Sequence, residues 1–316
     1  MSAPPESSMD TRKSRAALLS LGSNSLLVAT KLSIGWAIGS VSIFSEAIHS
    51  GLDLIAAVIA LWAVRASAKP ADREHPFGHG KFENLSGAIE ALLIFVAAAW
   101  IIIEAIERLA HPRVVEQPGF GLVVMLISAV LNYLVSQNLF RVGKDTDSIA
   151  LIADGWHLRT DVYTSLGVAG GMVLLWLGNR LAVPALVYAD PIVAMALALL
   201  ILKAAGQLTL GSVRDLLDER LPDEEIAWIE TYLSRCPDVE GYHDLRTRKA
   251  GAARFVEIHI ELPSTMTVRD SHEIARRVSS DIREHFPAAT VTVHVDPSDT
   301  DVPSSHPRAA APTKPE

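Results

Sequence analysis

Six apolar stretches, each long enough to cross a lipid bilayer as a helix, constrain this chain more than any other feature. A helix needs about 20 predominantly apolar residues to span the hydrocarbon core of a bilayer. We therefore expect a membrane-embedded, all-α bundle of six transmembrane helices within residues 16–210, preceded by a disordered tail at 1–15. The stretches lie at 16–38, 41–65, 84–108, 119–140, 149–177 and 185–208.

The basic residues of the short connections predict the orientation of this bundle. Cytoplasmic loops of membrane proteins carry an excess of Lys and Arg. That excess is found in the N-terminal flank and in the second-to-third and fourth-to-fifth connections, so both termini are expected in the cytoplasm. The basic residues concerned are Arg12, Lys13, Arg15, Arg65, Lys69, Arg73, Lys81, Arg141 and Lys144.

From residue 211 the apolar residues are spaced as in the amphipathic helices and strands of a soluble domain. The pattern predicts a helix, two strands flanking a turn, a second helix and a third strand. This order indicates an α+β, ferredoxin-like (αββαβ) cytoplasmic domain over 211–297, followed by a disordered tail at 298–316. The expected elements lie at 223–236, 239–248, 253–262, 269–285 and 290–296.

The net charge is concentrated in this soluble part. Residues 211–316 carry a formal charge of −7 and residues 1–210 a charge of −1, within a total of −8. An acidic domain would repel phosphate backbones, so nucleic acid is not an expected partner. The single Cys excludes an intramolecular disulfide framework and a multi-cysteine zinc site. Metal chemistry here would have to use the eleven His and the carboxylates.

Two predicted spans carry the same pair of ionisable residues at the same spacing. His49 and Asp53 lie in the second stretch, and His157 and Asp161 in the fifth. A spacing of four residues places both side chains on one helix face, and ionisable groups in a span mark a functional site by default. Together they offer two imidazole nitrogens and two carboxylate oxygens, which suit a tetrahedral divalent ion, zinc above all. The alternative is two unrelated His–Asp pairs that pack neighbouring helices.

Two lysines in the predicted spans have a simpler interpretation. Lys31 in the first stretch and Lys203 in the sixth are expected to extend their ammonium groups to the membrane interface. Neither residue is expected to need a function.

The connection between the second and third stretches holds a second group of ligand-type residues. Asp72, His75 and His79 can form a more exposed metal site. On spacing alone, a solvated polar loop remains the competing interpretation.

The predicted sheet carries a third group. In the second strand the alternation buries Val256, Ile258 and Ile260 and leaves His259 on the opposite face. In the last strand the same alternation turns His294 and Asp296 outward. Two outward His and a carboxylate on one sheet face can bind metal, although exposed surface histidines would show the same pattern.

Four segments together resemble the cation diffusion facilitator family. They are Ser42–Asp53, the loop Pro70–Lys81, the segment Asp154–Asp161 and the run Tyr242–Arg248. The resemblance covers nearly the whole chain apart from the two tails. It is strongest to the bacterial zinc and iron exporters, which are homodimers with six spans and a cytoplasmic metallochaperone-like domain.

The resemblance also implies the role of each site residue. The mid-membrane transport site would be His49, Asp53, His157 and Asp161, and the loop site Asp72, His75 and His79. The binuclear site of the soluble domains, at the dimer interface, would be His243, His259, His272, His294 and Asp296, with Asp296 as the bridge. Lys81 and Asp218 would form a charge interlock between protomers. The bacterial relatives have Asp where this chain has His49, a departure that favours zinc over ferrous iron or cadmium.

The resulting expectation is a homodimeric divalent-cation/proton antiporter of the bacterial inner membrane that exports zinc from the cytoplasm. Zinc would also act as a regulatory ion in the soluble domain, and no organic cofactor is expected. An intramembrane metal hydrolase is disfavoured, because no His-Glu-x-x-His motif occurs. A membrane metal sensor with structural zinc, and a carrier of Fe²⁺, Mn²⁺, Cd²⁺, Co²⁺ or Ni²⁺, remain alternatives.

Overall fold

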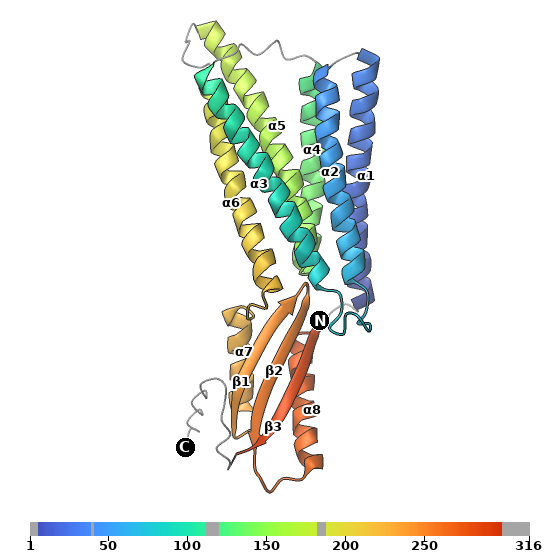
Figure 1. The fold of residues 1–316 in the computed structure, drawn as a ribbon, viewed down its shortest axis with the longest axis vertical. Coiled ribbons are helices and arrows are strands. Elements are labelled where there is room, and N and C mark those ends of the chain that lie inside the picture. The colour runs from blue at the N-terminus through green and yellow to red at the C-terminus, as the bar shows by residue number, and fades with distance from the viewer. Residues whose placement is uncertain (1–5, 39–40, 112–119, 182–187, 299–316) are drawn as a thin grey trace. The chain divides into compact units, whose positions relative to one another are not determined.

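The computed structural model describes residues 6–38, 41–111, 120–181 and 188–298 (Figure 1). The chain divides into two compact units, one comprising Ser7–Val213 and the other beginning at Arg214. We describe each unit by itself.

Six long helices make up the described part of the first unit. Four segments in these helices are long and apolar enough to cross a membrane, namely Ser8–Ile34, Lys81–Ala110, Val123–Asp145 and Pro191–Leu216. The second and fifth helices, which carry the predicted transport site, are not among these four, so six spans remain a prediction. The helices are α1 (Glu6–Ile38), α2 (Val41–Ser67), α3 (Lys81–Ala110), α4 (Phe120–Asp145), α5 (Ile149–Leu181) and α6 (Ala189–Leu216).

The N-terminal helix begins earlier than the sequence indicated. α1 starts at Glu6, so the prediction of a disordered tail is wrong for residues 6–15. The physical reason is tertiary, because two basic side chains of this stretch find partners on other helices. The Lys13 ammonium is buried 2.9 Å from a carboxylate oxygen of Glu83, and Arg12 lies 2.8 Å from Asp145.

Small residues allow α4 and α5 to approach closely. A Cβ added at Gly143 of α4 would lie 2.9 Å from the side chain of Ile152. A Cβ added at Gly155 of α5 would lie 3.0 Å from the ring of Phe140. Such small-residue contacts are typical of helix packing in membranes, where apolar side chains gain nothing by leaving lipid. Large apolar side chains accordingly remain on the outer faces, among them Trp36 and Ile103.

The second unit has the element order αββαβ that the sequence predicts. Its elements are α7 (Asp223–Arg235), β1 (Gly241–Ala250), β2 (Ala253–Leu262), α8 (Val268–His285) and β3 (Ala289–Pro297). The sheet order is β1-β2-β3, with β1 antiparallel and β3 parallel to β2. The predicted tail at 298–316 lies, apart from Ser298, outside the described residues.

One face of this sheet forms the core of the unit. Val256, Ile258 and Ile260 of β2 are buried against α7 and α8, as the alternation predicted. Both helices therefore cover the same face, and Figure 1 shows them together behind the three strands. The other face carries the histidines. In the strand register His243 pairs with His259, and His259 pairs with His294.

Candidate metal sites

The first group of ligands lies between α2 and α5, where the two helices bring their polar faces together. Asp53, His157 and Asp161 each offer a ligand atom, and these atoms lie within 4.8 Å of one another. The His157 Nε2 atom is 3.1 Å from Asp53 Oδ1, and both side chains are buried. His49 is on α2, but its side chain lies outside the described residues. Three of the four predicted transport-site residues are thus placed together.

These residues line a cavity of about 560 Å³. Asn132 of α4 also lines it, with its Nδ2 atom 3.5 Å from Asp161 Oδ2. Lys31 of α1 is a further lining residue and is only 4% exposed, with its ammonium donating to Ser50 Oγ at 2.8 Å. The expectation that Lys31 extends to the membrane interface is therefore wrong, because its side chain turns into this cavity. Lys203 is exposed on α6.

The second group lies in the connection between α2 and α3. Asp72 Oδ1 is 3.4 Å from His75 Nδ1, and Asp72 Oδ2 is 3.4 Å from His79 Nε2. The His79 Nδ1 atom lies 3.3 Å from the Lys69 carbonyl oxygen. A carbonyl only accepts, so this contact fits the tautomer with its proton on Nδ1, whose Nε2 atom can bind a metal.

The loop backbone also acts on the carboxylate of this group. The N–H groups of His75 and Glu74 donate to Asp72 Oδ1 at 2.7 and 3.0 Å. The His75 N–H is the main cause that lowers the pKa of the Asp72 carboxyl below its ordinary value. The loop therefore holds this group in the ionised form that binds a cation.

The third group lies on the uncovered face of the sheet, one residue from each strand. Ligand atoms of His243, His259 and Asp296 lie within 4.8 Å of one another. Asp296 Oδ2 is 2.9 Å from His259 Nδ1 and 3.3 Å from His243 Nε2, while its Oδ1 is 3.2 Å from His294 Nε2. Among the residues that the structure describes, neither buried ring nitrogen of His243 has a hydrogen-bond partner. Buried ring nitrogens that lie near a carboxylate and have no hydrogen bond fit the ligands of a metal ion.

Three predicted residues are not assembled with these groups. His272 is exposed on α8 and does not belong to the three-ligand group on the sheet. Lys81 begins α3 in the first unit, whereas Asp218 belongs to the second and lies 3.4 Å from Arg248. Their charge interlock stays a prediction.

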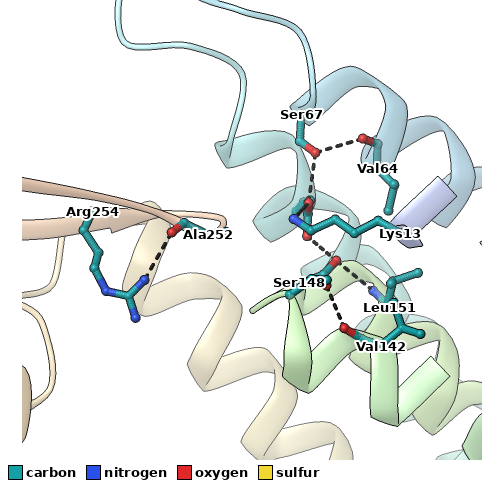
Figure 2. A network of polar contacts seen from close by, with 10 residues as sticks. Lys13, Val64, Ser67, Val142, Ser148, Leu151, Ala252 and Arg254 are labelled. Carbon is teal, nitrogen blue, oxygen red and sulfur yellow. Dashed lines mark hydrogen bonds and ion pairs between the residues drawn. The ribbon is translucent and has the colours of Figure 1, made fainter. Parts of the chain in front are cut away.

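A buried polar network that was not predicted from the sequence lies at the end of the first unit where α3 begins. Glu83 accepts from Lys13 and Ser67, each at 2.9 Å, and also from Ser148. Figure 2 shows Lys13, Ser67 and Ser148 turned toward one another from α1, α2 and the start of α5. A carboxylate in the first turn of an apolar helix is the one sequence signal that pointed to this network.

Two more carboxyls are buried deeper in the first unit. Glu90 of α3 and Asp154 of α5 have no exposed surface, and the Ser20 hydroxyl of α1 is a hydrogen-bonding neighbour of the Asp154 carboxyl. The two groups are close enough to interact electrostatically. Asp154 also interacts in this way with His157 and Asp53.

Comparison with known proteins gives matches over both units. Residues 17–217 match the model of the cation efflux transmembrane domain, and residues 221–298 match that of the cytoplasmic domain of cation efflux proteins. The chain is 35% identical to the cation-efflux pump FieF of Citrobacter koseri, over 90% of this chain and 92% of the pump. It is 34% identical to the uncharacterized transporter sll1263 of Synechocystis sp., over 95% of each chain.

One solved structure that it resembles is the metal-bound C-terminal domain of the CzcD transporter from Thermotoga maritima. The match has 28% sequence identity and a TM-score of 0.24, and it covers 26% of this chain and 100% of that domain.

Proposed function

Because the chain belongs to the cation diffusion facilitator family of cation efflux proteins, we propose that it exports a divalent metal ion, above all zinc, in exchange for protons. It is a multi-pass membrane transporter of cations and not an enzyme. The observation that carries the finer proposal is the buried group formed by Asp53, His157 and Asp161 between α2 and α5. His49, one turn before Asp53 on α2, would supply the fourth ligand.

The ligand chemistry supports zinc as the transported ion. Two imidazoles and two carboxylates form a four-coordinate set of the kind that zinc occupies in proteins. The set has no thiolate, because the only Cys of the chain is Cys236 in the second unit. A hard ion such as Mn²⁺ or Mg²⁺ is better served by oxygen ligands.

Proton exchange follows from the same ligands. Imidazole and carboxylate must be deprotonated to bind a metal ion, so metal binding releases protons and protons displace metal. In the proposed cycle the ion enters from the cytoplasm, the six helices change between inward-open and outward-open arrangements, and protons return through the emptied site. The protein would work in the bacterial inner membrane with both termini in the cytoplasm.

The second unit would be a cytoplasmic metal-binding and dimerisation domain. The match of residues 221–298 supports a homodimer, and His243, His259 and Asp296 provide a zinc site on its uncovered sheet face. His294 and His272 would complete a binuclear site with Asp296 as the bridge. Zinc bound there, and at the loop site of Asp72, His75 and His79, would regulate transport through a coupling free energy.

The antiporter proposal is tested with purified protein in liposomes. An outward-directed proton gradient should drive zinc uptake far beyond the amount of protein present, and Asp161→Asn should abolish it. Asp145→Asn is the matched control, because this exposed carboxylate of α4 pairs with Arg12 at the surface, away from the cavity. Uptake that stops at the protein's own binding stoichiometry would show a sensor with structural zinc.

A further inference from the structure

A buried amide of α4 contacts the transport site. Asn132 is 5% exposed and lines the same cavity of about 560 Å³ as Asp53, His157 and Asp161. Its Nδ2 atom lies 3.5 Å from Asp161 Oδ2. An ionised carboxylate binds N–H groups more strongly than a neutral oxygen does. A side chain outside the ligand group thus acts directly on one of the ligands.

The chemistry of this contact decides which end of the amide faces Asp161. The Nδ2 group donates, whereas Oδ1 only accepts, as do the oxygens of an ionised carboxylate. The reversed amide would place two acceptors against each other. Asn132 Oδ1 is buried, and among the described residues it has no hydrogen-bond partner.

Packing alone does not explain an amide at this position. A buried acceptor without a hydrogen bond destabilises a protein, and a leucine of similar volume would carry no such cost. The helices on either side of the contact are held firmly, because α4 and α5 approach closely at Gly143 and Gly155. A residue that is unfavourable for stability on a well-packed helix is expected where function needs it.

We propose that Asn132 is a positioning residue that sets the metal selectivity of the transport site. Its N–H group engages one oxygen of Asp161 and thereby favours binding of the ion through a single carboxylate oxygen. This inference rests on the proposed function, since it assigns a role in selecting the ion at the same site.

Coordination number explains how this contact would favour zinc. In closed protein sites zinc is almost always four-coordinate, so four residues that each give one atom complete its shell. Mn²⁺ suits octahedral sites made of oxygen ligands. A carboxylate that gives both oxygens raises the coordination number, as it does in calcium sites. Hydrogen bonds to a ligating carboxylate set its orientation, so an amide on one oxygen favours the four-coordinate ion.

The first test compares variants of the full-length protein in liposomes. Asn132→Leu removes the amide and nearly keeps the volume, and Asn132→Asp replaces the donor by an oxygen. Both should lower the ratio of kcat/KM for zinc to kcat/KM for manganese by at least about tenfold. Gln137→Met is the matched control, because it removes an exposed amide of α4 that donates to Tyr133 Oη at 3.0 Å. It should leave the ratio unchanged.

A purely structural role for Asn132 gives a different result. It would lower the transport of both ions by the same factor, so the ratio would stay that of the parent. An unchanged ratio overturns the inference even when the rates fall. Should Asn132→Leu fail to fold, the same criterion applies to Asn132→Asp.

Cobalt absorption of detergent-purified protein separates this inference from the antiporter proposal. Co²⁺ absorbs visible light strongly when it is four-coordinate and weakly when it is six-coordinate. The measurement uses full-length chains in which Asp72→Asn and Asp296→Asn disable the other two sites. Asn132→Leu should show weaker absorption per bound ion than its parent. This result supports the inference even if vesicles do not fill, which would contradict only the antiporter. Equal absorption contradicts the inference whether or not transport occurs.

Discussion

At the residue scale, Asp296 shows how one side chain can organise a metal site. Its two oxygens lie within 3.3 Å of ring nitrogens from His243, His259 and His294. A carboxylate that faces imidazoles on both oxygens can bridge two ions, which is the role proposed for it.

Replacing this carboxylate by an amide should weaken zinc binding by the second unit. In Asp296→Asn one oxygen becomes an NH₂ group, which cannot donate a lone pair to the metal. We expect the affinity of the sheet site to fall by at least about tenfold, measured as zinc bound per full-length chain at limiting free zinc. Glu284→Gln, an exposed change on α8, should bind zinc as the parent does. Equal zinc binding by Asp296→Asn and the parent would contradict the assignment.

Mild acidification should not remove the charge of Asp72 at the loop site. The pKa of the Asp72 carboxyl is lowered, because the His75 N–H stabilises its ionised form. A carboxyl with a lowered pKa stays charged as the pH falls from 7 to 5, whereas imidazoles as a class gain protons in this range.

This predicts the effect of Asp72→Asn. The substitution should weaken zinc binding by the same factor at every pH between 7 and 5, so that the slope of log affinity against pH stays as in the parent. The measurement is zinc affinity against pH in a chain whose other sites are disabled by Asp161→Asn and Asp296→Asn. A slope that changes with the Asp72 substitution would show that the carboxyl takes up a proton.

The residue scale also shows what a sequence can and cannot reveal. The spacing of His157 and Asp161 was readable, because helical periodicity alone puts them on one face. The outward direction of His259 and His294 was readable from strand alternation for the same reason. Lys31 was wrongly expected at the membrane interface, and Asn132 and Glu83 were missed, since the contacts of all three depend on which helices pack together. The spacing of residues along one helix or strand does not show which helices will be neighbours.

At the element scale, the Glu83 network joins α1, α2, α3 and the start of α5 (Figure 2). Lys13 and Glu83 are almost completely buried, so their pairing does not resemble an exposed ion pair. It also explains why α1 extends to Glu6, which the polarity of residues 6–15 concealed.

Breaking this pair should destabilise the first unit strongly. Glu83→Met leaves the Lys13 ammonium buried without its carboxylate, at an expected cost of about 3–5 kcal/mol. The double variant Lys13→Met with Glu83→Met removes both charges and should recover most of the loss. Thermal unfolding of the full-length protein in detergent measures both. Asp145→Asn, which breaks only the exposed pair with Arg12, should cost less than about 1 kcal/mol. If the double variant is no more stable than Glu83→Met, the loss does not come from an unpaired charge.

The elements of the second unit were predicted within about two residues at most ends, because its strands alternate and its helices are amphipathic. The first strand was predicted at 239–248, whereas the structure has it as β1 at Gly241–Ala250. Its register is interrupted between His243 and Arg246, and no alternation rule anticipates such an irregularity.

At the scale of the whole molecule, the first unit exposes large apolar side chains, as the transmembrane unit of a membrane protein does. Trp36 of α1 is 83% exposed, whereas Trp156 of α5 is half-buried and packs edge-on against Phe140. Composition predicted the apolar character of this unit, but it could not say which of two tryptophans faces outward.

Fluorescence quenching in liposomes distinguishes the two. Single-tryptophan proteins that retain only Trp36 or only Trp156 are reconstituted in lipids with brominated acyl chains. Bromine quenches on contact, so Trp36 should lose most of its emission and Trp156 should lose much less. Equal quenching would mean that the packing of α5 against α4 opens in the bilayer.

The three strands that carry the sheet site also impose an order in time. A ribosome makes the chain from the N-terminus at roughly 5–20 residues per second. Asp161 therefore emerges on the order of ten seconds before Asp296, and β3 can join β2 only after α8 has been made. A copy that stops early could insert its helices and carry Asp53, His157 and Asp161 without possessing any site on the sheet. A metal site built from His243, His259 and Asp296 would thus form only in copies translated at least as far as β3.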